Sequence, residues 1–191
     1  NVYAKKIGIN NSNFINASGW PDVNHYSTVF DLSLLSNDLI KNFPKLYEYF
    51  NIREFSYNDI NQPNRNRLLS DIEGADGLKT GFTKKSGWGV AGSALRDSRR
   101  ITVVINGANS SRSRLNESSN LINWAFSQTS EKKLITKGEI IKNVDVWLGN
   151  QSTINLVSSE DILSILSFDQ LQLIKTTISY KKPISAPITK N

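Results

Sequence analysis

A lysine, a threonine and a glycine follow one another within the run Asp76-Gly77-Leu78-Lys79-Thr80-Gly81-Phe82-Thr83. The ammonium group of Lys79 gives a positive potential that can bind a carboxylate or influence a neighbouring proton transfer, and the Thr80 hydroxyl offers a directional hydrogen bond. Gly81 lets another backbone approach closely, so residues 79–83 are suited to holding a peptide that adds to the edge of a sheet. An ordinary strand with an exposed lysine and a packing glycine is the alternative, which a three-residue motif does not exclude.

Short extended segments surround this motif and are expected to position it. Turn residues separate them, and the connections over residues 84–87 and 96–98 have the length of hairpin loops. The last three segments are therefore predicted to form an antiparallel meander. The predicted strands are residues 54–57, 77–80, 88–95 and 99–106.

Two amphipathic helices are expected to flank these strands. Hydroxyl and acidic residues at 27–31 favour a helix start, and the pattern continues to Lys41. This helix would place three leucines on one face, namely Leu32, Leu35 and Leu39. A second helix over residues 112–126 would bury the stripe Leu115, Ile122, Ala125 and Phe126. A sheet with flanking helices predicts an α+β class for residues 1–127.

The remainder of the chain, residues 128–191, has a different pattern. No helix is evident there, and alternating runs predict a second, all-β domain. These runs are residues 132–136, 140–148, 153–157 and 171–179. Because the sequence ends without a closing strand, this domain is expected to be incomplete.

The composition excludes several kinds of site. The 191 residues include no cysteine and a single histidine, His25, so neither thiol chemistry nor a histidine-based zinc site is expected, and we predict no metal and no cofactor. The net charge is +6, and all eight arginines lie between Arg53 and Arg114. This excess could attract carboxylates, phosphates or nucleic acid, or it could be an ordinary solvated surface.

The sequence also lacks methionine, although a natural gene product starts with one. We therefore expect the chain to be an interior piece of a longer protein, with any signal peptide or membrane anchor outside it. No stretch reaches 18 consecutive apolar residues, so no span is predicted within it.

Several segments together resemble a known family. The run 76–81, followed by Ser86-Gly87-Trp88 and by the strand pair up to Asn106-Gly107, is similar to the third motif region of the low-molecular-mass penicillin-binding proteins, the serine D-alanyl-D-alanine carboxypeptidases. The segments His25-Tyr26-Ser27-Thr28 with Asp31, and Gln62-Pro63-Asn64-Arg65-Asn66-Arg67-Leu68-Leu69, resemble linking segments of that family. The resemblance implies the later part of a transpeptidase-like or β-lactamase-like domain, joined to the start of the family's β-rich second domain.

The resemblance also implies roles for individual residues. In the family, a Ser-x-x-Lys motif and a Ser-x-Asn motif perform the acyl transfer and precede the Lys-Thr-Gly strand, so both are expected before Asn1 and no catalytic residue is assigned here. Lys79, Thr80, Gly81, Phe82 and Thr83 would contact substrate, and Arg114 would hold its terminal carboxylate. Arg112 lies close to Arg114 in the sequence and is the alternative arginine for this role. Phe82 stands where the family often has histidine, so no pH-sensitive role is carried over to it.

Look-alike motifs elsewhere are rejected as catalytic groups. Two Ser-x-x-Lys matches, at residues 130–133 and 179–182, follow the Lys-Thr-Gly strand and do not begin a helix. Two Ser-x-Asn matches, at residues 56–58 and 118–120, occur out of context. His25 lies two residues from Ser27, a spacing that rarely makes a catalytic pair, so His25 is expected to be structural.

By resemblance, the parent protein removes the terminal D-alanine from peptidoglycan stem peptides through an acyl-enzyme, outside the bacterial cytoplasmic membrane. Its implied partners are stem peptides ending in D-Ala-D-Ala and β-lactam antibiotics, and this chain alone is expected to be inactive. The alternatives are a β-lactamase or a transpeptidase with the same wall motif. A third alternative is a noncatalytic module that binds nucleic acid or another anionic polymer through its arginines, although the sequence has no recognised nucleic-acid motif.

Overall fold

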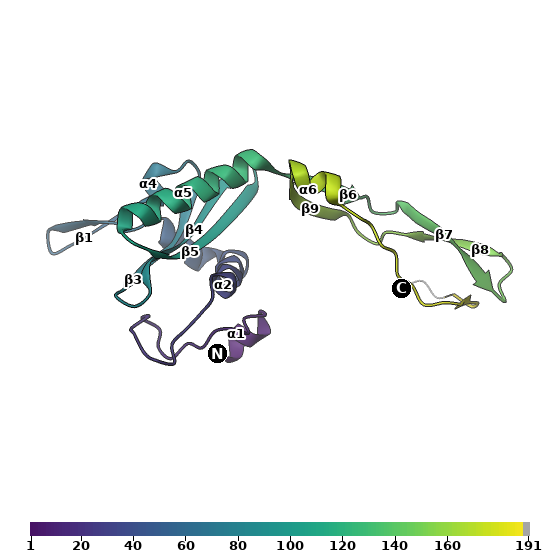
Figure 1. Ribbon diagram of the computed structural model, residues 1–191, viewed down its shortest axis with the longest axis horizontal. Coiled ribbons are helices and arrows are strands. Elements are labelled where there is room, and N and C mark those ends of the chain that lie inside the picture. The colour runs from purple at the N-terminus through teal and green to yellow at the C-terminus, as the bar shows by residue number, and fades with distance from the viewer. Residues whose placement is uncertain (189–191) are drawn as a thin grey trace. The chain divides into compact units, whose positions relative to one another are not determined.

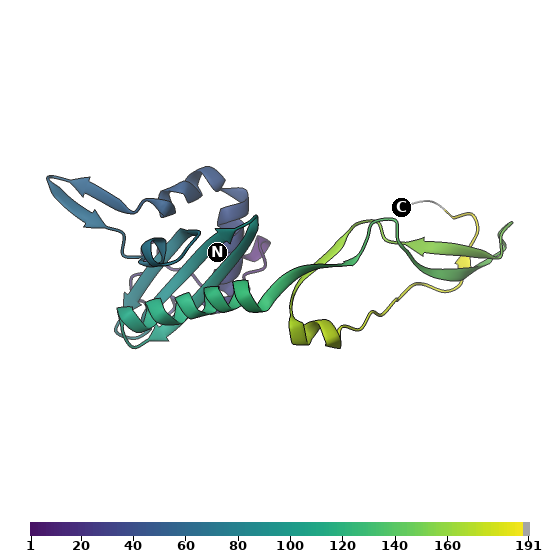
Figure 2. The ribbon, with the colours of Figure 1, turned by 90° about the horizontal axis from the view of Figure 1, so that it is seen from above.

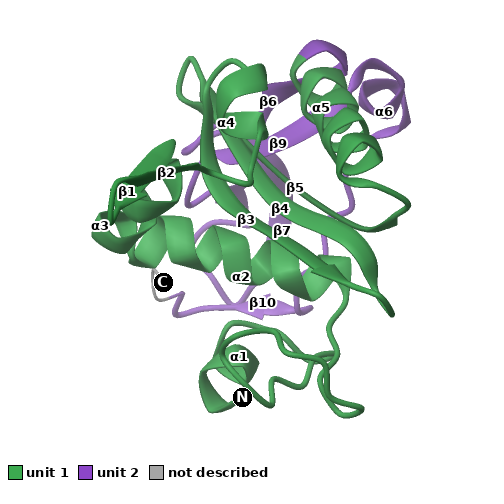
Figure 3. Cartoon of the chain, turned by 90° about the vertical axis from the view of Figure 1, so that its left-hand side faces the viewer, with its two compact units in different colours: residues 1–126 green, residues 127–191 purple. Residues whose placement is uncertain are grey.

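The computed structural model describes residues 1–188 and divides the chain into two compact units, Asn1–Phe126 and Ser127–Asn191 (Figure 3). The first unit is built on the three-stranded antiparallel sheet β3(Ala75–Thr83), β4(Gly87–Arg96) and β5(Arg99–Ala108). The predicted meander is thus confirmed, and each of its strands is longer than the range predicted for it. The α+β expectation for this part is confirmed as well.

Two long helices lie on opposite faces of this sheet (Figures 1 and 3). Helix α5(Ser111–Gln128) covers one face, where Ile122 packs with Leu68, Ile72, Ala75, Val90 and Ala94. Helix α2(Val29–Asn42) lies against β5 on the other. The predicted cap is Thr28, whose hydroxyl accepts a hydrogen bond from the Asp31 N–H. The three leucines predicted for its apolar face, Leu32, Leu35 and Leu39, are only half-buried, and the buried residues of this helix are Asp31 and Ser36.

Shorter elements complete the first unit. Helix α1(Val2–Lys6) ends before Gly8, which has φ of +85°, and α3(Pro44–Tyr47) continues into the 3-10 helix η1(Glu48–Asn51). Strand β1(Glu54–Tyr57) has its predicted bounds and pairs with β2(Ile60–Pro63) in a hairpin (Figure 2). Strand β2 was not predicted, because its sequence Ile-Asn-Gln-Pro has none of the alternating aromatic residues of β1, although both strands are exposed at all four residues. Helix α4(Leu68–Asp71) then leads towards β3.

The second unit contains two small sheets. Strand β6(Thr129–Ile135) pairs with β9(Ile162–Ser167), and β7(Ile140–Trp147) lies between β8(Thr153–Val157) and β10(Ile184–Ser185). The predicted strands 132–136, 140–148 and 153–157 are confirmed, but β9 was missed. Strand β10 pairs in parallel with β7, so the expectation that no strand follows residue 181 was wrong.

The prediction of a strand over residues 171–179 was also wrong, as was the expectation of no helix after residue 128. Helix α6(Phe168–Leu173) begins at Ser167, whose hydroxyl accepts from the Gln170 N–H while the Gln170 side chain accepts from the Ser167 N–H. This capping box stabilises a helix start, and it outweighs the apolar alternation that follows. Among the described residues, no helix is long and apolar enough to cross a membrane.

A candidate substrate groove beside strand β3

Strand β3 lies at the edge of its sheet. Its inner side pairs with β4 through Lys79 with Ala91, Thr80 with Val90 and Gly81 with Gly89. Within residues 1–188, no strand pairs with its outer side. The outer edge therefore presents backbone groups to which an extended peptide can add.

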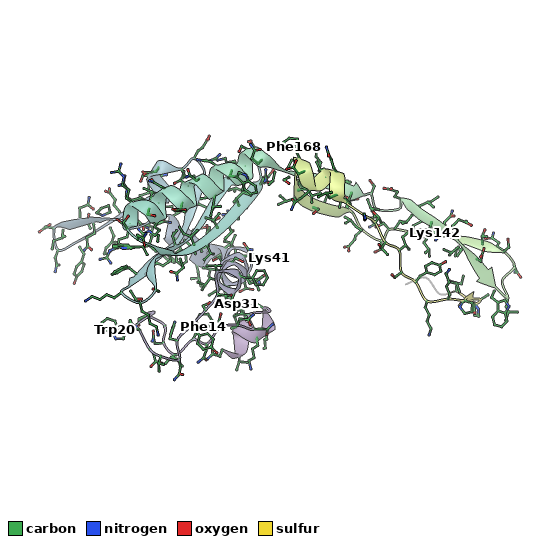
Figure 4. The ribbon with its side chains drawn as sticks, in the orientation of Figure 1. Phe14, Trp20, Asp31, Lys41, Lys142 and Phe168 are labelled. Atoms are coloured by element: carbon green, nitrogen blue, oxygen red, sulfur yellow. The ribbon has the colours of Figure 1, made fainter. Side chains whose placement is uncertain are left out.

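A large open groove of about 1890 Å³ lies along this edge. The structure brings all six residues predicted for the site to its wall, namely Lys79, Thr80, Gly81, Phe82, Thr83 and Arg114. The loop between α1 and α2 lines it as well, through residues that include Phe14 (Figure 4) and His25. Sequence patterns do not predict that this loop lines the groove, because the loop is far from β3 along the chain.

The polar groups of the motif have different surroundings. Lys79 is exposed, and its Nζ donates to the Thr80 carbonyl at 2.7 Å. Thr80 is buried. The Thr83 hydroxyl lies 2.7 Å from the Ser86 hydroxyl and accepts from the Ser86 N–H at 2.9 Å. Thr83 thus closes the β3–β4 turn, while the ammonium of Lys79 remains available at the groove.

Gly81 is not required by the packing of the chain itself. A Cβ placed there would meet no heavy atom within 4 Å, and the backbone does not have the positive φ that favours glycine. By contrast, a Cβ at Gly77 would lie 2.6 Å from the Tyr47 hydroxyl. The open space beside Gly81 fits a position at which another backbone approaches the strand.

Arg114 is a nearly buried cation in the first turns of α5, with 7% of its surface exposed. Its Nη2 donates to the Arg65 carbonyl at 3.3 Å, and its Cζ lies over the Trp88 ring, 5.4 Å from the centroid. No carboxylate among residues 1–188 forms an ion pair with it. Burial lowers the pKa of this guanidinium below its ordinary value, because the charged form is desolvated. A buried charge of this kind is stabilised by an anion, and an anion can reach it through the groove.

Arg112, the alternative arginine, also lines the groove, but its side chain is exposed.

Two sets of contacts hold the start of β3. On one side, the buried Asn66 donates from Nδ2 to the Gly77 carbonyl at 2.9 Å. On the other, Asp76 accepts from the Tyr47 hydroxyl at 2.6 Å and forms an ion pair with Arg100 at 2.7 Å. Arg100 also donates to Ser93 at 2.6 Å. These groups fix the strand immediately before Lys79. These contacts were not predicted from the sequence, because the residues that form them lie far apart along the chain.

Burial and the hydrogen bond to Asp76 raise the pKa of Tyr47 to about 12. Desolvation is the larger cause, since it disfavours the phenolate. The phenol is therefore a proton donor to Asp76 throughout the ordinary pH range.

The loop opposite β3 is anchored by Asp31, which is 1% exposed. Its Oδ2 accepts from the Asn11 N–H at 2.8 Å and from the Ser12 hydroxyl at 2.7 Å. His25 accepts through Nδ1 from the Ile15 N–H at 3.3 Å and lies edge-on to Phe14. His25 thus holds the loop together, as a structural histidine does.

The rejected motifs have structural contacts. The buried Ser118 hydroxyl donates to the Arg114 carbonyl at 2.7 Å, and Ser56 lies 3.1 Å from the Asn61 side chain in the exposed hairpin. No group of three or more metal-binding side chains occurs within residues 1–188.

Comparison with known proteins identifies the family. A family profile described as D-alanyl-D-alanine carboxypeptidase matches residues 1–110. The chain belongs to this family. A second profile, described as the C-terminal domain of penicillin-binding protein 5, matches residues 130–191.

Relatives of this family match along the whole chain. D-alanyl-D-alanine carboxypeptidase DacC of Escherichia coli (strain K12) is 35% identical over 100% of this chain and 48% of its own length. DacF of Bacillus subtilis (strain 168) is 32% identical over 100% of this chain and 50% of its own. The chain thus spans about half the length of the curated relatives it matches.

Solved structures of the family have the same fold. Penicillin-binding protein 5 from Haemophilus influenzae superimposes with a TM-score of 0.81 at 29% identity, over 99% of this chain and 56% of that one. Penicillin-binding protein D2 from Listeria monocytogenes, in its cefotaxime-bound form, gives a TM-score of 0.61 at 32% identity, over 66% of this chain and 53% of that one. The expected fold class, an α+β unit followed by a β-rich unit as in the structure of penicillin-binding protein 5, is confirmed.

Proposed function

We propose that the full-length protein containing this chain is a serine-type D-alanyl-D-alanine carboxypeptidase that trims peptidoglycan stem peptides and is acylated by penicillins. The observation that carries the proposal is the position of Arg114, a buried cation without an acidic partner in residues 1–188, in the same groove as the unpaired edge of β3. The family to which the chain belongs supports it, as does the cefotaxime complex of the Listeria relative.

In this proposal the two ends of the bound peptide are held by different groups. The terminal carboxylate of the substrate accepts hydrogen bonds from the guanidinium of Arg114, and its backbone adds to the outer edge of β3 beside Gly81. The open space at Gly81 admits that backbone. Lys79 supplies positive potential near the reacting carbonyl, where negative charge develops during acyl transfer.

The chemistry is a two-step acyl transfer with a serine supplied from outside residues 1–191. The serine oxygen attacks the carbonyl of the penultimate D-alanine, the C–N bond breaks, and D-alanine leaves with a proton on its amine. Water then hydrolyses the ester, which releases the shortened peptide and restores the hydroxyl. We place this activity on the outer side of the bacterial cytoplasmic membrane, where stem peptides occur.

The test is acylation by a labelled penicillin. In the full-length protein, we expect Lys79→Ala to lower the acylation rate about 100-fold, the size of effect seen when one electrostatic contact to a transition state is removed. Lys132→Ala is the matched control, since Lys132 is an exposed lysine on β6 and should leave the rate unchanged. The chain by itself should form no covalent adduct. Unchanged acylation of Lys79→Ala would contradict the assignment of this wall.

Rates of turnover distinguish a carboxypeptidase from a β-lactamase or a transpeptidase. We expect the full-length protein to release D-alanine from a D-Ala-D-Ala peptide faster than it hydrolyses penicillin. Faster hydrolysis of penicillin would indicate a β-lactamase, and transfer of the acyl group to an added amine in preference to water would indicate a transpeptidase.

A further inference from the structure

Three side chains that line the groove, Phe82, Trp88 and Arg114, are joined through the ring of Trp88, and we call them the stack. Phe82 and Trp88 are direct partners in the β3–β4 pairing, and their ring centroids are 4.3 Å apart with an interplanar angle of 33°. The Arg114 Cζ lies over the same Trp88 ring at 5.4 Å. Trp88 therefore contacts an aromatic ring of the sheet and also the guanidinium on α5.

Trp88 is a main support of this guanidinium. The hydrogen bond from Arg114 to the Arg65 carbonyl is long, at 3.3 Å, and no described carboxylate within residues 1–188 pairs with the cation. A cation over an aromatic face is attracted by the ring quadrupole, more strongly where it is desolvated, as Arg114 is. This contact uses no N–H group of the guanidinium, so the donors that Arg65 does not take remain available for a two-pronged bond to a carboxylate.

We propose that Trp88 is a positioning residue for Arg114, and that the stack makes the groove selective for substrates with a free C-terminal carboxylate. The inference rests on the proposed function for the identity of that substrate. Its new content is the role of Trp88, which acts through Arg114 and does not itself bind the carboxylate.

Phe82 is the exposed member of the stack. It is 53% exposed and its ring lies against Trp88, whereas within residues 1–188 the guanidinium of Arg114 lies over the Trp88 ring and not over that of Phe82. Removing Phe82 leaves the contact between Trp88 and Arg114 in place. Phe82→Ala is therefore expected to change carboxylate selectivity less than Trp88→Ala does.

The experiment compares two peptides that differ only at their C-terminus, one ending in D-Ala-D-Ala with a free carboxylate and the other in the corresponding amide. For the full-length protein, kcat/KM is measured for both, and the acid-to-amide ratio is the readout. We expect Trp88→Ala to lower this ratio about tenfold, mostly through a higher KM for the acid, since one order of magnitude corresponds to a contact of the cation–π size. Amide turnover should change little.

Further variants separate positioning from general damage. Trp88→Phe keeps an aromatic face and should restore most of the ratio. Trp124→Ala, on the helix α5 that carries Arg114 but away from the groove, should leave the ratio unchanged. In the double variant Arg114→Ala/Trp88→Ala, the ratio should be no lower than in Arg114→Ala alone, because Trp88 acts through Arg114. A Trp88→Ala protein that loses acid and amide turnover equally, or keeps the wild-type ratio, would overturn the proposal.

Binding without chemistry keeps this inference separate from the proposed function. The affinities of the same two peptides for the protein are measured by calorimetry in the wild type and in Trp88→Ala. A wild type that prefers the acid but hydrolyses neither peptide would remove the carboxypeptidase proposal, while loss of that preference in Trp88→Ala would still support the stack. Equal affinities for the acid in both proteins would overturn it.

Discussion

The two units of the chain have similar strand patterns but differ in what covers the strands. In the first unit, α5 lies on the meander and buries a contiguous apolar cluster around Ile122, which is fully buried. In the described part of the second unit, residues 127–188, Val144 is the apolar side chain that is buried, at 3% exposure. Many other apolar side chains there are exposed, including Trp147, Leu148 and Phe168.

The difference shows that alternation along a strand does not by itself make a core. A small sheet is stable when another layer covers its apolar face, and α5 provides that layer in the first unit. The site depends on this, because β3 and Arg114 belong to the two layers that the core joins.

The ion pairs of the two units differ in the same way. Asp76 and Arg100 are about one-quarter exposed and share contacts with Tyr47 and Ser93. Lys133 and Asp161 pair at 2.7 Å on an open surface, where 48% and 40% of their side chains are exposed. Solvent screens the second pair much more than the first.

The largest expected effect comes from removing core volume. Ile122→Ala should destabilise the first unit by about 3 kcal/mol, since it leaves a cavity in a close-packed cluster. Val144→Ala should cost about 1 kcal/mol in the second unit, because its partly exposed surroundings can collapse. Urea unfolding of the chain, followed by tryptophan fluorescence, measures both. Equal losses would mean that the second unit has a core as tight as that of the first.

An intermediate effect is expected from Tyr47 at alkaline pH. Its pKa in the folded chain is raised to about 12, above the ordinary value of 10.0, so the folded state retains the proton longer than the unfolded state. The stabilisation is complete below pH 10 and is lost as the pH rises towards 12, at about 1 kcal/mol per pH unit.

The variant Tyr47→Phe isolates this titration. It should be less stable than the wild type at pH 8, because the hydrogen bond to Asp76 is lost, but its stability should fall less steeply between pH 10 and 11. Denaturant midpoints at these three pH values give the comparison. Parallel curves for the two proteins would show that Tyr47 is not the group that titrates.

The smallest expected effect is at Asp161. Hydrogen bonds from Lys133 and from the Lys137 N–H lower the pKa of this carboxyl below its ordinary value. A lowered pKa gives stabilisation that is present above the ordinary value and is lost as the pH falls through the folded one. Asp161→Asn should therefore lower the unfolding midpoint of the second unit slightly at pH 7 and leave it unchanged near pH 2. A large loss at pH 7 that persists in 1 M salt would contradict the screening argument.

Sequence patterns predicted those parts of the fold in which local signals are strong. The meander has hairpin turns between alternating segments, and α5 has a recognisable apolar stripe that includes Ile122. The same stripe did not predict that Arg114 and Ser118 would be buried on α5. Their burial follows from contacts with Arg65 and with the helix backbone, which periodicity does not encode.

The site was predictable where a motif carried it and not where distant segments supply it. The run 79–83 and Arg114 were predicted from residue types and resemblance, and the structure places them on the wall of one groove. Trp88 was included in that resemblance but received no role, because the role now proposed for it depends on the approach of α5 to β4. The contacts of Tyr47 with Asp76 join residues 29 positions apart, and no spacing rule predicts them.

At Gly81, the requirements of folding and those of ligand binding can be separated, because the space beside this residue is open. Since no heavy atom of the described residues 1–188, chain neighbours apart, lies within 4 Å of a Cβ placed there, an alanine would meet no steric obstacle from them and would reduce the freedom of the unfolded backbone. Its methyl group would stand only in the path of an incoming molecule. If the proposed function holds, Gly81→Ala is therefore expected to weaken binding of the substrate backbone without lowering the stability of the fold.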